Sequence, residues 1–296
     1  MTNEPAGAVD IPFFDTHIHF WHRRNSELSY EFLKPDYVST AAGNVDLIKS
    51  PTYDFDGYRA ESRFAMVVKA VHIQAAIGTA DPVQETAWLQ QEADRISLPL
   101  AIVAGAPLLA ANLEAILERH LAYANVRGIR DRLDGTDLGD RAFDSGLRLL
   151  AKYDLSLEVG CTWQHMPELG RVAGRHPATR FVLVHMGLPV GRDAEYFAHW
   201  SQQLRALGRF DNISCKISGV GLWDPLWTIE SIRPWVMECI SAFGTSRCFF
   251  ASNWPIDRQY SSFDSLITAM RECISVFTRE EQEALFLHNA ERAYRM

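Results

Sequence analysis

Eight short apolar runs alternate with longer segments of helical spacing along the 296 residues of the chain. Short apolar runs are typical of strands buried on both faces, and parallel neighbours need a helical crossover between them. Eight such units in a chain of this length favour a closed (β/α)8, or TIM, barrel of the α/β class over a doubly wound sheet. The predicted strands are 11–19, 64–75, 98–107, 125–132, 155–161, 180–187, 212–219 and 247–253.

Segments with helical spacing lie between most of these strands and after the last one. The first begins at Asp81-Pro82, which we interpret as an N-cap followed by proline at the first helical position. A dinucleotide-binding sheet needs a GxGxxG turn, and the sequence contains none. We therefore expect a single barrel domain over residues 1–296. The predicted helices are 82–95, 109–123, 140–153, 165–176, 193–207, 228–243, 261–277 and 278–288.

A long insertion at about residues 20–63 separates the first two predicted strands. It is rich in aromatic residues, namely Trp21, Tyr30, Phe32, Tyr37, Tyr53, Phe55 and Tyr58. A connection of this length in a compact domain is usually a lid or binding loop, but it can also be a packed excursion that seals one end of the barrel. The sequence leaves both interpretations open.

Composition excludes several classes of partner. The formal net charge is −8, and the chain has no run of five or six basic residues that could follow a nucleic-acid backbone. No apolar run reaches the roughly 18 residues of a membrane span, and the N-terminus MTNEPAGAVD does not resemble a signal peptide. Five scattered cysteines without a CxxC pair indicate reduced thiols. We expect a cytoplasmic protein that acts on a small molecule, either alone or as a homo-oligomer.

The segment Asp15-Thr16-His17-Ile18-His19 is the strongest functional signal. In a strand, residues two apart point to the same face, so His17 and His19 are expected to project together. Catalytic groups in this architecture lie where the strands end. Two imidazoles at that place can supply half of a divalent metal site or a cradle for a substrate oxyanion.

Other polar residues are predicted at strand ends. His185 follows a buried aliphatic run and must find a polar partner there. Arg130, assisted by Arg132, suits a clamp on a substrate carboxylate, whereas Lys216 fits either an anionic ligand or a structural ion pair. Glu158 remains open as a metal ligand, a partner of Lys216 or a satisfied barrel acid. The remaining predicted substrate-binding residues are Gln74 and Trp21.

A serine hydrolase mechanism has no support, since the nucleophile elbow GxSxG is absent from the sequence. No cysteine lies in a recognisable catalytic setting. We interpret six further histidines as structural: His72, His120, His165, His176, His199 and His288.

Several segments together resemble the amidohydrolase superfamily, in particular the amidohydrolase-2 branch with its pyrone dicarboxylate and sugar-acid lactonases. They occur in the family's order from about residue 11 to the C-terminus. The matching segments are FFDTHIHFW, VHIQA, RGIRD, RHPATRFVLVHMGLP, NISCKISG, CFFASNWPID and FLHNAERAYR.

This resemblance implies attack of water on a ring carbonyl, with an acidic residue at the end of strand eight as the base. His17, His19 and His185 would face the carbonyl or hold one divalent metal, zinc or manganese. The sequence departs from the family pattern S-D-W-P, because Asn253 stands where the aspartate is usual. An amide cannot act as a general base, so both a metal-free mechanism and a metal-dependent one stay open. Asp257, Asp15 and Glu158 are the candidate replacements.

The leading hypothesis is a hydrolase that opens a small, carboxylated lactone, with His17, His19, His185, Asn253 and Asp257 as candidate catalytic residues. A metal-dependent decarboxylase or hydratase is the first alternative, although Asn253 counts against it. A catalytically silent barrel with a binding role is the second. The sequence does not reveal the substrate ring.

Overall fold

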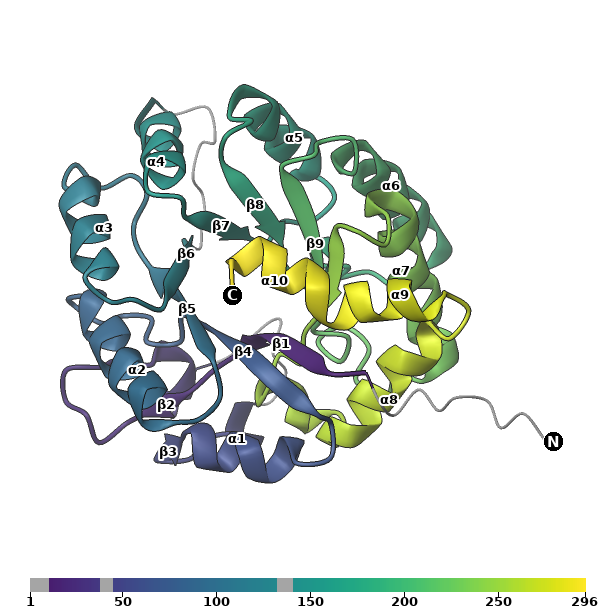
Figure 1. The fold of residues 1–296 in the computed structure, drawn as a ribbon. Coiled ribbons are helices and arrows are strands. Elements are labelled where there is room, and N and C mark those ends of the chain that lie inside the picture. Colours follow the sequence, from purple (N-terminus) through teal and green to yellow (C-terminus); the bar gives the residue numbers. More distant parts are fainter. Residues whose placement is uncertain (1–10, 38–44, 132–140) are drawn as a thin grey trace.

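The computed structural model describes residues 11–37, 45–131 and 141–296, drawn in colour in Figure 1. Two sequence interpretations fall outside these ranges: the N-terminal residues considered as a signal peptide, and Arg132 as an assistant to Arg130. Within the described ranges, no helix combines the length and apolarity that a membrane span requires.

Eight parallel strands form one sheet in sequential order, as predicted for a barrel. The sheet closes where Ile18 forms a bridge with Trp254 and where Thr16 donates a hydrogen bond to the carbonyl oxygen of Phe250. All eight predicted strands are present and shorter than predicted, and the chain is a single-domain (β/α)8 barrel. The strands are β1 (Phe13–Ile18), β4 (Val67–Ile73), β5 (Leu100–Gly105), β6 (Val126–Arg130), β7 (Ser156–Val159), β8 (Arg180–Leu183), β9 (Ile213–Ile217) and β10 (Cys248–Phe250).

All but the last of the predicted helices surround the sheet as a ring, which Figure 1 shows in end view. Pro82 occupies the N-cap of the first of them, so this helix begins one residue later than predicted. The last one continues through a π-helical turn, Ala284–His288, instead of ending there. The helices are α2 (Val83–Arg95), α3 (Leu113–Leu121), α4 (Arg141–Lys152), α5 (Met166–Arg175), α6 (Ala194–Leu207), α7 (Ile229–Phe243), α8 (Phe263–Cys273), α9 (Arg279–Glu283) and α10 (Asn289–Tyr294).

The described part of the insertion contains structure that the sequence did not predict. Its elements are β2 (Trp21–His22), paired antiparallel with β3 (Thr52–Tyr53), the short 3-10 turns Glu31–Leu33 and Val45–Leu47, and α1 (Phe55–Ser62). Trp21 is fully buried here and donates its indole N–H to the carbonyl oxygen of Ser50. The described part of this segment is therefore a packed excursion against the barrel.

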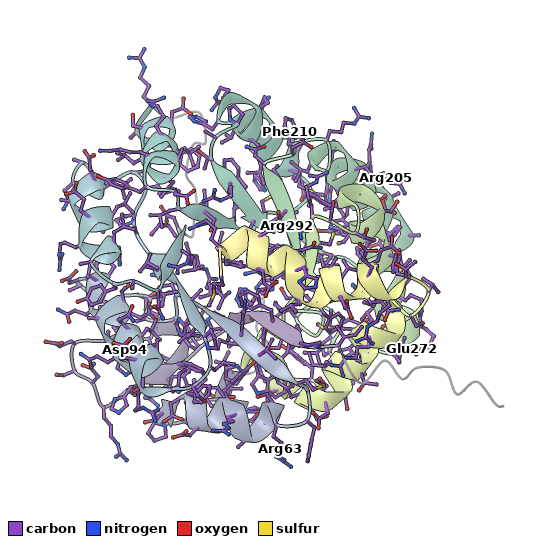
Figure 2. The ribbon with its side chains drawn as sticks, in the orientation of Figure 1. Arg63, Asp94, Arg205, Phe210, Glu272 and Arg292 are labelled. Carbon is purple, nitrogen blue, oxygen red and sulfur yellow. The ribbon has the colours of Figure 1, made fainter. Side chains whose placement is uncertain are left out.

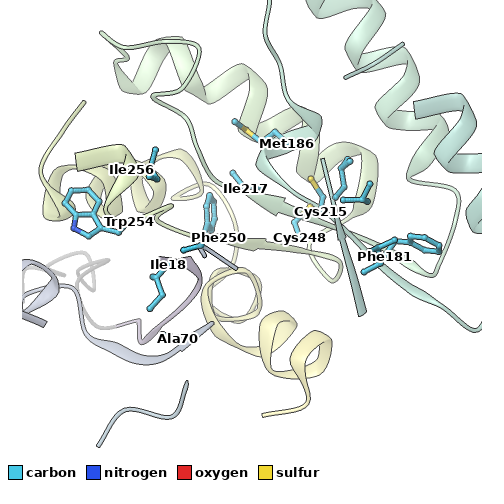
Figure 3. Packing of buried hydrophobic residues seen from close by; sticks show 14 of the residues in the cluster. Ile18, Ala70, Phe181, Met186, Cys215, Ile217, Cys248, Phe250, Trp254 and Ile256 are labelled. Atoms are coloured by element: carbon cyan, nitrogen blue, oxygen red, sulfur yellow. The ribbon is translucent and has the colours of Figure 1, made fainter. Parts of the chain in front are cut away.

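Apolar packing fills both sides of the sheet. Between the sheet and the helices, residues such as Cys215, Ile217 and Phe250 pack together (Figure 3). Charged side chains such as Arg63, Asp94 and Glu272 occupy the outer surface (Figure 2).

Inside the barrel, the ring of Tyr294 packs against Phe14 and Phe249. Tyr294 belongs to α10, which crosses the barrel axis in Figure 1. This helix therefore closes the end of the barrel at which the strands begin and leaves the opposite end for the functional groups.

Candidate active site

A bulge near the end of β1 determines where the two histidines point. Asp15 pairs with Ala70 and Ile18 with His72, so three residue steps in β1 oppose two in β4. In a regular strand, His17 and His19 would share the outward face of Asp15, whose carboxylate accepts a hydrogen bond from Tyr58 of α1. The extra residue reverses this alternation and turns both imidazoles into the barrel.

The structure brings His17 and His19 together with His185. The Nε2 atoms of His17 and His19 lie 3.1 Å apart, and the ring of His17 lies 4.6 Å from that of His185 between centroids. Nδ1 of His19 donates to the carbonyl oxygen of Ile73 at 2.9 Å, which leaves its Nε2 as an acceptor in the neutral ring. His17 therefore donates from Nε2, and its buried Nδ1 has no partner among the described residues.

All three imidazoles are neutral at physiological pH. Burial lowers the pKa of His17 well below its usual range, and the neighbouring His185 adds to this effect. Burial, and after it the charge of Arg130, likewise lower the pKa of His19. Burial also lowers the pKa of His185 to about 3. Neutral rings can donate hydrogen bonds to a developing oxyanion or offer lone pairs to an electrophile.

His185 is held by the loop that follows β9. Its Nδ1 lies 2.8 Å from the hydroxyl of Ser218, which lies two residues after Lys216. Gly219 comes next with a positive φ of +64°, and a Cβ there would lie 2.8 Å from the same nitrogen. Only glycine therefore fits at that position without displacing the imidazole. Sequence reasoning missed Ser218, although its strand parity with Lys216 was a usable signal.

Arg130 and Gln74 lie at the adjoining strand ends. Nη1 of Arg130 donates to the carbonyl oxygen of Gln74 at 3.1 Å, and both residues are only partly buried. The side chain of Gln74 crosses directly over Gly105, where a Cβ would lie 1.9 Å from the amide nitrogen. These two polar groups therefore occupy one sector of the barrel mouth.

Lys216 is in the barrel interior and is paired. Its Nζ lies 2.8 and 3.0 Å from the two oxygens of Glu158 and 2.7 Å from the carbonyl oxygen of Thr16, which engages all three of its N–H donors. The hydroxyl of Tyr294 donates to the same carboxylate. Of the two sequence interpretations of Lys216, this geometry favours the structural ion pair.

Asn253 and Asp257 form a buried hydrogen-bonded pair after β10. Nδ2 of Asn253 donates to Oδ2 of Asp257 at 2.6 Å, and the backbone N–H of Gly221 donates to Oδ1 at 3.0 Å. Burial raises the pKa of the Asp257 carboxyl to about 7 despite both hydrogen bonds. Asp257 is fully enclosed, and the side-chain amide of Asn253 donates a hydrogen bond to it.

Asp15 has a positioning role in the structure. Its carboxylate accepts hydrogen bonds from the backbone and side chain of Ser252 and from Tyr58, which ties the end of β1 to the end of β10 and to α1. Burial nevertheless raises its pKa to about 6. Sequence reasoning identified Asp15 but missed Ser252 and Tyr58 as its partners.

The donors fit a zinc ion only in part. The 3.1 Å between Nε2 of His17 and Nε2 of His19 is close to the ~3.3 Å edge of a tetrahedral zinc site. Across residues 11–37, 45–131 and 141–296, however, no three His, Cys, Asp or Glu side chains are arranged to hold one ion. Asn253 directs its amide nitrogen at Asp257. The described side chains therefore do not complete a metal site.

Comparison with known proteins places this geometry in context. The profile of the Amidohydro_2 family, described as amidohydrolase, matches residues 14–296. The uncharacterized protein y4mH of Sinorhizobium fredii is 32% identical, over 97% of this chain and 99% of that protein. L-fucono-1,5-lactonase of Burkholderia ambifaria is 26% identical over 95% of each chain.

Solved structures share the fold over nearly the whole length. The crystal structure of an amidohydrolase from Burkholderia multivorans with bound HEPES has a TM-score of 0.82 at 25% identity, covering 96% of this chain and 99% of that one. A structure described in the same words but with bound zinc has the same TM-score and coverage at 24% identity. The family match spans the barrel and every strand end described above, and the chain is a member of the amidohydrolase family.

Proposed function

We propose that the protein hydrolyses a small lactone by attack of water on the ring carbonyl. The observation that carries this proposal is the convergence of His17, His19 and His185 at the carboxyl ends of β1 and β8. Three neutral imidazoles in a buried site can stabilise the negative charge that develops on the carbonyl oxygen. The similarity to L-fucono-1,5-lactonase along the whole chain supports a lactone substrate.

His185 is the proposed donor to the oxyanion. When the hydroxyl of Ser218 donates to Nδ1, the proton of the neutral ring lies on Nε2. His17 and His19 complete the wall around the carbonyl, with their relative orientation fixed by the hydrogen bond from His19 to Ile73. Loss of one such donor in other hydrolases lowers kcat by roughly 100- to 1,000-fold.

Arg130 and Gln74 are the proposed binding residues for a polar substituent on the ring. The guanidinium at the end of β6 suits a carboxylate, because two parallel N–H donors match its two oxygens. Trp21 and Lys216, both fully buried, would act on the substrate only through the groups that they support.

The test is ring opening of a panel of 1,4- and 1,5-aldonolactones and carboxylated pyrone lactones, followed by proton release. We expect turnover by the wild type, a loss of at least 100-fold in kcat for His19→Ala, and no loss for His288→Ala, an exposed residue beyond the closed end of the barrel. Wild-type rates in both His17→Ala and His19→Ala would overturn the proposal. So would binding of panel lactones without turnover.

A further inference from the structure

Asn253 lies in the segment after β10, at the point where the barrel closes. The backbone N–H of His19 donates to the carbonyl oxygen of Trp254, the residue after Asn253, at 2.8 Å, so this segment lies next to the end of β1. Asn253 has a positive φ of +58°, which asparagine tolerates better than most residues. Its side chain is nearly enclosed, with 2% of the residue exposed.

The hydrogen bonds of this pair determine which way the amide faces. An ionised carboxylate only accepts hydrogen bonds, so the group of Asn253 that lies 2.6 Å from Oδ2 of Asp257 is the NH2. The carbonyl oxygen of Asn253 is therefore on the other branch, turned away from Asp257. Among the described residues, none donates a hydrogen bond to that oxygen.

Hydrolysis of a lactone needs a group that both contacts water and retains the proton taken from it. Neither Asn253 nor Asp257 meets both requirements. Asn253 can receive a hydrogen bond but cannot retain a proton. Asp257 can retain a proton but has no exposed surface with which to meet water. The 2.6 Å hydrogen bond links the two residues, because it places the proton on Nδ2 of Asn253 in line with Oδ2 of Asp257.

We propose that Asp257 is the proton acceptor of the reaction and acts through the side-chain amide of Asn253. The proposal rests on the lactonase function proposed above. As the water oxygen bonds to the carbonyl carbon, one water proton moves to Oδ1 of Asn253 and a proton moves from its Nδ2 to Oδ2 of Asp257. The amide becomes its imidic acid form, and the charge of Asp257 is transferred to the tetrahedral intermediate.

Collapse of the intermediate reverses both transfers. The ring C–O bond breaks, the leaving oxygen takes the proton from Oδ1 of Asn253, and Asp257 returns its proton to Nδ2. The new carboxylic acid then ionises to solvent, so the step consumes only lactone and water and regenerates the pair. Within the described ranges, the titrating group that interacts with Asp257 is Tyr260, whose pKa is raised by burial and by Asp257. The elevated pKa of Asp257, about 7, matches it to such a role near neutral pH.

Two isosteric variants test the relay. In Asp257→Asn, the oxygen of the new amide must still accept the hydrogen bond from Gly221, so its NH2 group faces Asn253. The side chain of Asn253 must then turn its oxygen toward position 257 and its own NH2 group toward the site. We expect kcat to fall at least 100-fold with unchanged urea stability. In the exchange Asn253→Asp/Asp257→Asn, the amide at position 257 still accepts from Gly221, and its NH2 donates to the carboxylate at position 253. A carboxylate then meets water directly, and we expect kcat within about tenfold of the wild type.

Proton inventories in mixtures of H2O and D2O separate the relay from a direct base. Two protons move in the same step in the wild type, so a plot of its kcat against the deuterium fraction of the solvent should be curved. Only one proton moves in the exchanged variant, so its plot should be a straight line. Activity of the wild type that is lost in His19→Ala but kept in Asp257→Asn would overturn the relay and leave the lactonase function intact. An exchanged variant as inactive as Asp257→Asn would also overturn it.

Discussion

Nζ of Lys216 lies 2.8 Å from Oε2 of Glu158 inside the barrel, with side chains 0% and 1% exposed. Removal of one member of a buried pair leaves an uncompensated charge, at a cost of roughly 3–5 kcal/mol. We expect Lys216→Met to lower the free energy of unfolding by about that much. The double variant Lys216→Met/Glu158→Gln should recover most of the loss, measured by urea denaturation.

The same variants separate a structural role of Lys216 from substrate binding. If the pair is structural, the double variant keeps KM close to that of the wild type. A large rise in KM in a double variant of near-normal stability would instead indicate that Lys216 binds substrate.

Gly105 leaves room for Gln74 at the barrel mouth. A methyl group at this position meets the far end of a flexible side chain, so we expect Gly105→Ala to cost little stability but to move the Gln74 amide. If Gln74 binds substrate, KM should rise several-fold in Gly105→Ala and in Gln74→Ala alike, with kcat less affected. Steady-state kinetics on any accepted lactone would check this, and an unchanged KM in both variants would remove Gln74 from the substrate site.

Glu85 makes stability depend on pH. Its Oε1 accepts hydrogen bonds from the backbone N–H groups of Ala75 and Ala76, and burial raises its pKa from 4.5 to about 7. Between these two values the folded protein keeps a proton that the unfolded chain has lost, so the wild type loses stability as pH rises. Glu85→Gln lacks this titration and keeps the acceptor oxygen.

We therefore expect the stability of Glu85→Gln relative to the wild type to increase from pH 4.5 to pH 7, by on the order of 3 kcal/mol, and to stay level above that. Urea denaturation at several pH values measures the difference. A difference that is independent of pH would show that the carboxyl of Glu85 is not the group responsible.

The incomplete set of metal donors predicts a low metal content. Catalytic zinc sites usually have three protein ligands, and the described residues align only two. We expect purified protein to contain well below one equivalent of zinc or manganese by ICP-MS, and kcat to survive treatment with EDTA. Stoichiometric metal that disappears together with activity in His17→Ala/His19→Ala would contradict this expectation.

The sequence predicts the fold because the fold depends on repeated local patterns. Each of the eight strands, and each helix that follows the second to eighth strands, is marked by its own apolar spacing, and there the prediction errs only at the ends, by a few residues. The described part of the segment around Trp21 escaped prediction because β2 and β3 have two residues each and depend on pairing with each other. A strand of two residues is too short to show a periodic apolar pattern.

The site was predictable only as a set of candidates. Strand ends single out His17, His185 and Arg130, because barrel geometry gathers those ends. The pairing of Lys216 with Glu158 joins residues 58 positions apart, so the sequence could offer it only as one of three interpretations of Glu158. The enclosure of Asp257 could not be predicted, since a carboxylate beyond a strand end can face the substrate or a neighbouring loop.

The irregular pairing between Asp15 and Ile18 shows that the H-x-H motif alone does not establish the site. A relative could keep D-x-H-x-H at the end of this strand and yet pair the strand without the bulge, and a comparison of short motifs would not detect the difference. Its two imidazoles would then point away from the barrel interior, toward α1, because a shift of one residue in the pairing moves side chains to the opposite face. Among relatives of this chain, the bulge is therefore a better marker of an assembled site than the two histidines themselves.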